Sequence, residues 1–298
     1  TCGAKQAVFN ACMAVFDTGD RVLVPSPYWG TFPEAVKLAG AQPLIVDSRY
    51  SHGFIPLLED IESKLDRSVR GLILNTPNNP TGAVLPGRLI RDLVRLADRH
   101  GLFLLCDETY DSFTYAPVKH ESLAAFVESE NPNYAVVGSF SKTYSMTGWR
   151  LGYCIACRKL IEHLNALQSH STGNASTIAQ WAALSLFENE SDGLFFRETI
   201  LSEFAARRIL VCSFLQQTPG FRCFAPDGAF YVFPEARECL QRLGLENSDE
   251  LARLLLHEGR VATVPGSAFG RDGFIRISYA VPTERLQEGL QRIREITG

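Results

Sequence analysis

The sequence predicts an α/β protein with a mostly parallel sheet, followed by a smaller α+β part. Buried-strand patterns alternate with helical patterns through the first half of the chain, and the composition shifts after about Ser202. The chain has 298 residues and 46% hydrophobic content, which is enough for a large buried core. Strands that alternate with helices predict a three-layer fold with a largely parallel sheet.

The strands expected in the first part are apolar throughout rather than alternating, as strands covered on both faces are. We place them at residues 21–25, 43–47, 71–76, 102–107 and 134–140. Helical patterns fall between them at residues 4–16, 31–39, 58–64 and 88–100. Gly101 follows the last of these helices and is a plausible stop signal.

The second part begins with long helical stretches, expected at residues 168–189 and 195–217. Strands are then expected at residues 221–224, 229–233, 261–264 and 274–279, with helices at 248–258 and 283–296. We therefore predict two domains, a large one over residues 1–201 and a small C-terminal one over residues 202–298.

Charge and cysteine usage exclude several function classes. The net charge of −4 gives no reason to expect a nucleic-acid or membrane partner. Most of the eight cysteines lie in apolar runs, which favours a reducing, cytoplasmic location. Cys154 and Cys157 form the only C-x-x-C, without a second such pair or a histidine pair, so we predict no metal site.

Polar and aromatic residues gather after four of the predicted strands. Trp29 follows the first strand, Asn79 the third, Asp107 ends the fourth, and Lys142 follows the fifth. Open α/β sheets bind ligands beyond the carboxyl ends of their strands. We therefore expect these side chains to meet at one edge of the sheet.

Lys142 is the most informative of these residues. It lies in Ser139-Phe140-Ser141-Lys142 and shortly before Arg150. The hydroxyls and the guanidinium suit a phosphate, and the amine suits a Schiff base with an aldehyde cofactor. Burial and Arg150 would lower the pKa of such a lysine. The alternative is an ordinary solvated lysine.

Asp107 ends a very apolar strand, where a carboxylate is costly unless a cation pairs with it. A protonated pyridine nitrogen would serve, and a helix cap or an ordinary salt bridge is the alternative. Arg276 lies inside another apolar strand, where its fork fits a substrate carboxylate or a structural ion pair.

Three further features carry weaker signals. Gly3 and Ala4 open a helix whose free N–H groups could cradle a phosphate. Trp29 suits either core packing or stacking on an aromatic ring. Residues 78–82, Asn-Asn-Pro-Thr-Gly, read as a turn on composition alone.

Taken together, the motifs resemble those of a pyridoxal-phosphate (PLP) aminotransferase of the aspartate aminotransferase superfamily (fold type I, class I/II). The motifs that carry the resemblance are Asn78-Asn79-Pro80-Thr81-Gly82, Asp107-Glu108-Thr109-Tyr110, Ser139-Phe140-Ser141-Lys142 with Thr147-Gly148-Trp149-Arg150, and Arg276-Ile277-Ser278-Tyr279. The resemblance runs essentially from Thr1 to the C-terminus. It implies transfer of an amino group from an L-amino acid to a 2-oxo acid, by a homodimer.

The resemblance also implies a role for each matching residue. Lys142 would carry PLP as a Schiff base, and Asp107 would keep its pyridine nitrogen protonated. Asn79 and Tyr110 would hydrogen-bond the phenolic oxygen, and Trp29 would stack on the ring. Gly3, Ala4, Ser139 and Arg150 would bind the phosphate. Arg276 would bind the substrate α-carboxylate, with Trp29 and Asn79 nearby.

Residues 3–7, Gly-Ala-Lys-Gln-Ala, further resemble the prokaryotic-type aspartate aminotransferase branch, in which a lysine at the position of Lys5 is associated with acidic substrates. Aspartate with 2-oxoglutarate is therefore the substrate pair that Lys5 favours, and aromatic and branched amino acids remain open as alternatives. Family members carry a further N-terminal segment, which is absent here. The alternatives are a C–S lyase or decarboxylase on the same fold, a non-enzymatic effector domain, and an inactive truncated form.

Overall fold

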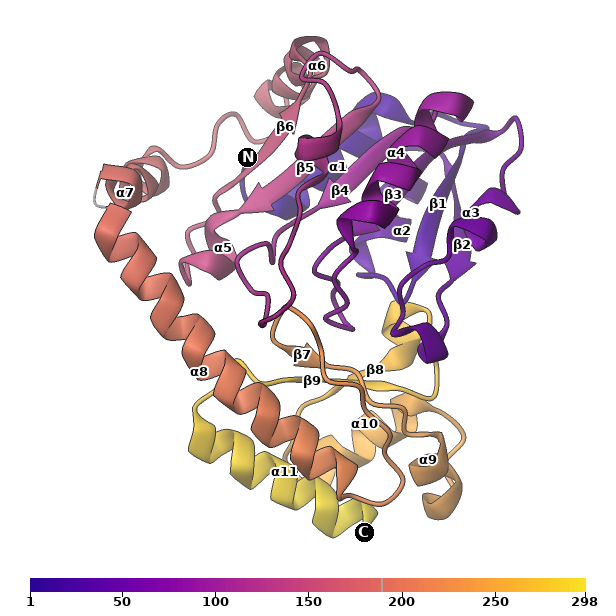
Figure 1. Cartoon of the computed structure of the whole chain (residues 1–298), viewed down its shortest axis with the longest axis vertical. Coiled ribbons are helices and arrows are strands. Elements are labelled where there is room, and N and C mark those ends of the chain that lie inside the picture. The colour runs from indigo at the N-terminus through magenta and orange to yellow at the C-terminus, as the bar shows by residue number, and fades with distance from the viewer. Residues whose placement is uncertain (189) are drawn as a thin grey trace.

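The computed structural model describes residues 1–188 and 190–298. Figure 1 shows two sheets, a large one near the N-terminus and a small one near the C-terminus, with a long helix running beside both. This arrangement agrees with the predicted α/β class. The predicted domain boundary after residue 201 falls inside the long helix and stays a prediction.

The large sheet has the strand order β2-β1-β3-β4-β5-β6. Its first five strands are parallel, as predicted, and β6 pairs with β5 in the antiparallel direction. The strands are β1 (Arg21–Ser26), β2 (Gln42–Asp47), β3 (Val69–Asn75), β4 (Phe103–Asp107), β5 (Tyr134–Ser139) and β6 (Gly152–Ala156).

Helices cover both faces of this sheet, which explains why its central strands are apolar throughout. One face packs against α1 (Ala4–Val15), α2 (Thr31–Leu38) and α6 (Arg158–Ser169). The other packs against α3 (Leu58–Glu62), α4 (Gly87–His100) and the short η2 (Leu123–Phe126). Helix α4 buries Ile90, Leu93, Val94 and Ala97, a stripe at helical spacing, and ends at Gly101 in the left-handed conformation, as predicted.

The small sheet is antiparallel, with the order β7-β9-β8. Its strands are β7 (Tyr231–Val232), β8 (Val264–Pro265) and β9 (Ile275–Ser278), and its helices are α9 (Arg237–Leu243), α10 (Ser248–His257) and α11 (Thr283–Thr297). The remaining elements are α5 (Phe140–Thr143), α7 (Thr177–Glu188), α8 (Glu190–Gln216), η1 (Tyr50–His52) and η3 (Gly266–Phe269). Helix α8 starts beside α7 and runs along α11 (Figure 1).

Several predicted elements were wrong. Residues 221–224 form no strand, and only Arg222 makes a single bridge, with Glu235. The helix expected from residue 168 begins only at Thr177, because the chain turns at Gly173 with a positive φ of 73°; its predicted end, Asn189, lies outside the described residues. Helices α6 and α9 and strand β6 were not predicted. No helix in the described ranges has the length and apolar character needed to cross a membrane.

Candidate active site

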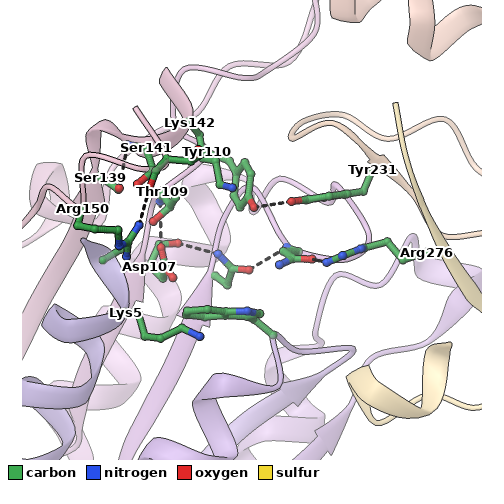
Figure 2. Close-up of a pocket in the computed structure, with 15 residues that line it drawn as sticks. Lys5, Asp107, Thr109, Tyr110, Ser139, Ser141, Lys142, Arg150, Tyr231 and Arg276 are labelled. Carbon is green, nitrogen blue, oxygen red and sulfur yellow. Dashed lines mark hydrogen bonds between the residues drawn. The ribbon is translucent and has the colours of Figure 1, made fainter. Parts of the chain in front are cut away.

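A cavity of about 390 Å³ lies where the carboxyl ends of the large sheet face the small sheet (Figure 2). Strands β3, β4 and β5 end in Asn75, Asp107 and Ser139, all of which line it. The full lining is Ala4, Lys5, Trp29, Asn75, Asn79, Asp107, Thr109, Tyr110, Ser139, Ser141, Lys142, Thr147, Arg150, Tyr231 and Arg276.

The structure thus brings together every site residue expected from the sequence except Gly3. Gly3 does not line the cavity itself but lies against the guanidinium of Arg150, which does. Five lining residues had received no role in the sequence analysis: Asn75, Thr109, Ser141, Thr147 and Tyr231. The first four lie within or beside the recognised motifs, whereas Tyr231 comes from the small sheet and had no such signal.

One end of the cavity suits a phosphate. Gly3 is the N-cap residue of α1, with a φ of 84°, and no side chain caps this helix end. The Gly3 N–H donates to Thr1 O at 2.9 Å and the Gln6 N–H to Gly3 O at 3.2 Å, so the N–H groups of Ala4 and Lys5 are the ones this helix end offers to an anion. Arg150 is held beside them, because its Nη1 donates to Thr147 O at 2.8 Å and its Nη2 to Cys2 O at 3.3 Å.

Ser139 and Lys142 belong to the turn that follows β5. Ser139 Oγ accepts a hydrogen bond from the Ser141 N–H at 3.0 Å. Ser139 thereby caps the N-terminus of the short helix α5. Lys142 lies one turn later, with its Nζ 5.7 Å from the centre of the Phe230 ring. Burial lowers the pKa of Lys142, and the positive charges of Arg276 and Arg150 lower it further. A larger fraction of Lys142 is therefore neutral near neutral pH than of a solvated lysine, and only the neutral amine can act as a nucleophile or a base.

Asp107 lies in the middle of the cavity wall and is only 4% exposed. Burial raises its pKa to about 6, although its Oδ1 accepts a hydrogen bond from the Thr109 N–H at 3.0 Å. A buried carboxylate of this kind is stabilised when a cation is placed beside it. The neighbouring Thr109 Oγ1 is also buried and has no partner among the described residues.

Asn75 holds the loop that carries Asn79. Its side-chain oxygen accepts from the Asn79 N–H at 2.8 Å, and its amide donates to Asp107 O at 3.0 Å. These two bonds hold the backbone of Asn79 beside the end of β4 at Asp107.

The opposite end of the cavity suits a carboxylate. Arg276 comes from β9, and its Nη1 donates to Asn79 Oδ1 at 2.8 Å. Its guanidinium lies over the rings of Tyr231 and Phe269, at 4.5 and 5.0 Å. Its Nε is buried without a partner in the described parts of the chain. This cation therefore has donors left for an anion.

Trp29 and Lys5 close the side of the cavity that faces α1 and α2. Lys5 Nζ lies 5.1 Å from the centre of the Trp29 ring, and the Trp29 ring packs edge-on against Phe32 at 5.4 Å. On the facing side, the hydroxyls of Tyr110 and Tyr231 are 2.8 Å apart. An aromatic plate, a lysine, a buried acid and an arginine at each end thus surround one space (Figure 2).

Comparison with known proteins identifies this arrangement. The family model for aminotransferase class I and II matches residues 1–293. The chain belongs to this family. It is 39% identical over 293 residues to the probable aspartate/prephenate aminotransferase of Aquifex aeolicus, covering 98% of this chain and 74% of that protein. It is 35% identical over 292 residues to the aspartate aminotransferase of Bacillus subtilis, with the same coverage.

Solved structures of an aromatic and an aspartate aminotransferase have the same fold. The aromatic aminotransferase of Pyrococcus horikoshii superposes with a TM-score of 0.92 at 34% identity, covering 99% of this chain and 77% of that one. A double mutant of the Thermus thermophilus aspartate aminotransferase gives a TM-score of 0.92 at 35% identity, covering 99% and 75%. The chain therefore has the fold type I architecture expected from the sequence.

The chain is accordingly a PLP-dependent aminotransferase, an enzyme that moves an amino group between an amino acid and a 2-oxo acid. The cavity fits this cofactor on its own evidence. A buried acid with a raised pKa matches a pyridine nitrogen, a lysine with a lowered pKa matches an aldehyde, and an uncapped helix end beside Arg150 matches a phosphate.

Proposed function

We propose that the cavity holds PLP through Lys142 and that the enzyme transfers the amino group of aspartate to 2-oxoglutarate. The observation that carries this proposal is one pair of side chains in one cavity: the Lys142 amine, whose pKa is lowered, and the Asp107 carboxyl, whose pKa is raised to about 6. Environments that shift an amine and an acid in these directions are typical of catalytic sites.

Each end of the cavity supplies one part of the binding. At the uncapped end of α1, Arg150, Ser139 and the N–H groups of the first helical turn would bind the phosphate. Asp107 would accept a hydrogen bond from the protonated pyridine nitrogen, and Trp29 would cover one face of the ring. Asn79 and Tyr110 would donate to the phenolic oxygen.

The chemistry is divided between the cofactor and the protein. When bound, PLP supplies an electron sink for the negative charge that develops at the substrate Cα. Once the substrate amine has displaced it from the cofactor, the Lys142 amine would accept the Cα proton and return it to the cofactor side, and its lowered pKa favours the neutral form near neutral pH. Asp107 keeps the ring nitrogen protonated and so strengthens that electron sink.

Arg276 and Lys5 would select the substrate. The free donors of Arg276 suit the α-carboxylate, and Lys5 adds a second positive charge at the mouth of the same cavity. Two cations fit a dicarboxylic amino acid. The names of the relatives from Aquifex aeolicus and Bacillus subtilis, which include aspartate, support the same choice.

Reduction with borohydride tests the proposal directly. Protein supplied with PLP is expected to absorb in the near-ultraviolet or visible range, and reduction should then fix the cofactor to Lys142. Peptide mapping by mass spectrometry locates the label, and Lys142→Ala serves as the matched control. A label on another lysine, or none in the presence of excess PLP, contradicts the assignment. Kinetics with aspartate, tyrosine and leucine as amino donors then test the substrate choice.

We also propose a second copy of the chain as the partner. Helix α7 exposes Ile178, Trp181 and Phe187, at 76%, 68% and 62%. Large apolar groups gathered on one helix are typical of a covered surface. Sedimentation velocity should show a dimer that Trp181→Glu weakens. The eight free cysteines support a cytoplasmic location, which stays a prediction.

A further inference from the structure

Tyr231 lies between two residues to which the proposed function gives roles, Tyr110 and Arg276 (Figure 2). It comes from β7, lines the cavity and is 6% exposed. Its hydroxyl is 2.8 Å from that of Tyr110, and its ring centre is 4.5 Å from the guanidinium carbon of Arg276. The hydroxyl and the ring therefore contact different partners and can be removed separately.

The direction of the hydrogen bond between the two tyrosines follows from counting hydrogens. A neutral phenol has one hydrogen to donate. If Tyr110 donates its hydrogen to the phenolic oxygen of the cofactor, its own oxygen must accept in the bond with Tyr231. Tyr231 is then the donor, and its hydroxyl decides where the hydrogen of Tyr110 points.

Both hydroxyls stay protonated in the pH range of the reaction. Burial raises the pKa of Tyr231, and the charge of Arg276 acts in the other direction. Burial also raises the pKa of Tyr110 well above its ordinary value. The pair is therefore two neutral phenols, as the hydrogen count requires.

The ring of Tyr231 has a different partner. The Arg276 guanidinium contacts the rings of Tyr231 and Phe269, and its Nη1 donates a hydrogen bond to Asn79. A guanidinium over an aromatic face is attracted by the ring and is also kept flat against it. The stacking covers the faces of the guanidinium and leaves its edge for hydrogen bonds, where the buried Nε has no partner among the described residues.

We propose that Tyr231 is a positioning residue with two separable tasks: its hydroxyl turns the hydrogen of Tyr110 toward the cofactor, and its ring orients Arg276 for the substrate carboxylate. The inference rests on the proposed function, because Tyr110 and Arg276 act on cofactor and substrate there. Tyr231 would thereby connect the cofactor end of the site with the end that binds the substrate carboxylate.

Tyr231→Phe tests the first task, since it removes the hydroxyl and keeps the ring. The Schiff base of Lys142 with PLP loses a proton as the pH rises. The pH at the midpoint of this titration is measured from the change in absorbance. A donor to the phenolic oxygen favours the deprotonated form, so weaker donation raises the midpoint. We expect Tyr231→Phe to raise it by about half to one pH unit. Tyr110→Phe should raise it at least as much, and the double variant no further than Tyr110→Phe alone.

Tyr231→Leu tests the second task, since it removes the ring as well. Succinate, an unreactive dicarboxylate, serves as the probe, and its Kd is read from the absorbance change of the loaded protein. We expect Tyr231→Phe to bind succinate within about twofold of the unsubstituted protein and Tyr231→Leu to bind it about tenfold more weakly. Tyr231→Met, which fills more of the same space, replaces Tyr231→Leu if the latter does not fold.

Tyr279→Phe is the matched control. Its hydroxyl donates to that of Tyr115 at 3.0 Å in another buried tyrosine pair, which does not line the cavity. The Tyr279→Phe variant should have the same titration midpoint and the same Kd for succinate as the unsubstituted protein. An unchanged midpoint in Tyr231→Phe overturns the hydroxyl task, and equal succinate affinities for the Phe and Leu variants overturn the ring task. Borohydride fixation at Lys142 of the unsubstituted protein tests the proposed function by itself, so the two failures are distinct.

Discussion

Arg276 and Asn79 are joined by a hydrogen bond of 2.8 Å from Nη1 to Oδ1, although 197 positions separate them in the sequence. The bond connects strand β9 of the small sheet to the loop after β3 of the large sheet. Asn79 is in turn held by Asn75, which also binds the backbone of Asp107. The carboxylate end of the site and the ring end are therefore parts of one hydrogen-bonded chain.

Replacing Arg276 with lysine should raise the KM for the amino acid by about ten- to a hundredfold while the Schiff-base absorbance persists. Lysine keeps the charge but loses the fork that grips a carboxylate and the bond to Asn79. Steady-state kinetics and an absorbance spectrum measure the two effects. Arg271→Lys, at an arginine 3.5 Å from Asp47 and outside the cavity, is the control and should leave KM unchanged. Loss of cofactor absorbance in Arg276→Lys would contradict a role confined to the substrate.

Asp107→Asn should stabilise the cofactor-free protein and weaken PLP binding. The folded state raises the pKa of Asp107 from 3.8 to about 6, so stability falls as the pH rises through this window and stays lower above it. The asparagine variant lacks this cost, which is at most about 3 kcal/mol above pH 6 and vanishes below about pH 4. Urea unfolding at pH 4 and pH 8 measures the difference.

Asp272→Asn provides the opposite sign as a control. Burial raises the pKa of Asp272, but hydrogen bonds from Ser248 and the Gly273 N–H, together with the charge of Arg237, outweigh this effect and hold the pKa below its ordinary value. Its carboxylate therefore stabilises the fold above its unfolded pKa, and this stability is lost as the pH falls through the folded pKa. The asparagine variant should be the less stable protein at pH 8. A stability gain for Asp272→Asn, or none for Asp107→Asn, would show that the two environments were wrongly assigned.

Gly3→Ala should weaken PLP binding by more than its effect on folding explains. Gly3 has a φ of 84°, and a Cβ there would meet the guanidinium of Arg150, which would have to leave the helix end. Gly19→Ala is the matched control, because Gly19 has a φ of 97° but no atom within 4 Å of the added Cβ. Both variants should lose about 1–2 kcal/mol to backbone strain. Equilibrium titration with PLP should distinguish them, and equal affinities would argue against the phosphate role of this corner.

Lys5→Met should lower kcat/KM for aspartate by about ten- to a hundredfold and leave tyrosine within about threefold, because only the acidic side chain loses a charged partner. Lys37→Met, at a lysine paired with Glu34 on α2 and away from the cavity, should alter neither value. The ratio of the two kcat/KM values is the readout. If the ratio is the same in Lys5→Met and in the unsubstituted protein, Lys5 does not contribute to substrate selection.

Much of the site was predictable because its residues follow buried strands. Asp107 and Ser139 end such strands, and Lys142 follows one, so the parallel sheet carries them to one edge whatever the details of the helices. Strand β6 escaped prediction because it lies at the sheet edge, with Cys154 and Ala156 only half-buried and Ile155 exposed, and so lacks the continuous apolar pattern of the others.

Tyr231 could not have been predicted in the same way. Its partner Tyr110 lies 121 positions away, and the run around it indicates only an apolar strand. Residues 221–224 failed for a related reason: an apolar run of strand length predicts a strand, but whether a neighbouring strand pairs with it is decided by tertiary packing.

The division of the cavity between two sheets has a consequence for how the enzyme fails on heating. Asp107, Lys142 and Arg150 come from the large sheet and its flanking segments, whereas Arg276 and Tyr231 come from the short strands β9 and β7, whose hydrophobic core also takes in Tyr110, Phe113 and Tyr115. If the core around β7 and β9 melts first, the protein loses its grip on the amino acid while the coenzyme remains attached. Inactivation would then precede the bleaching of its colour.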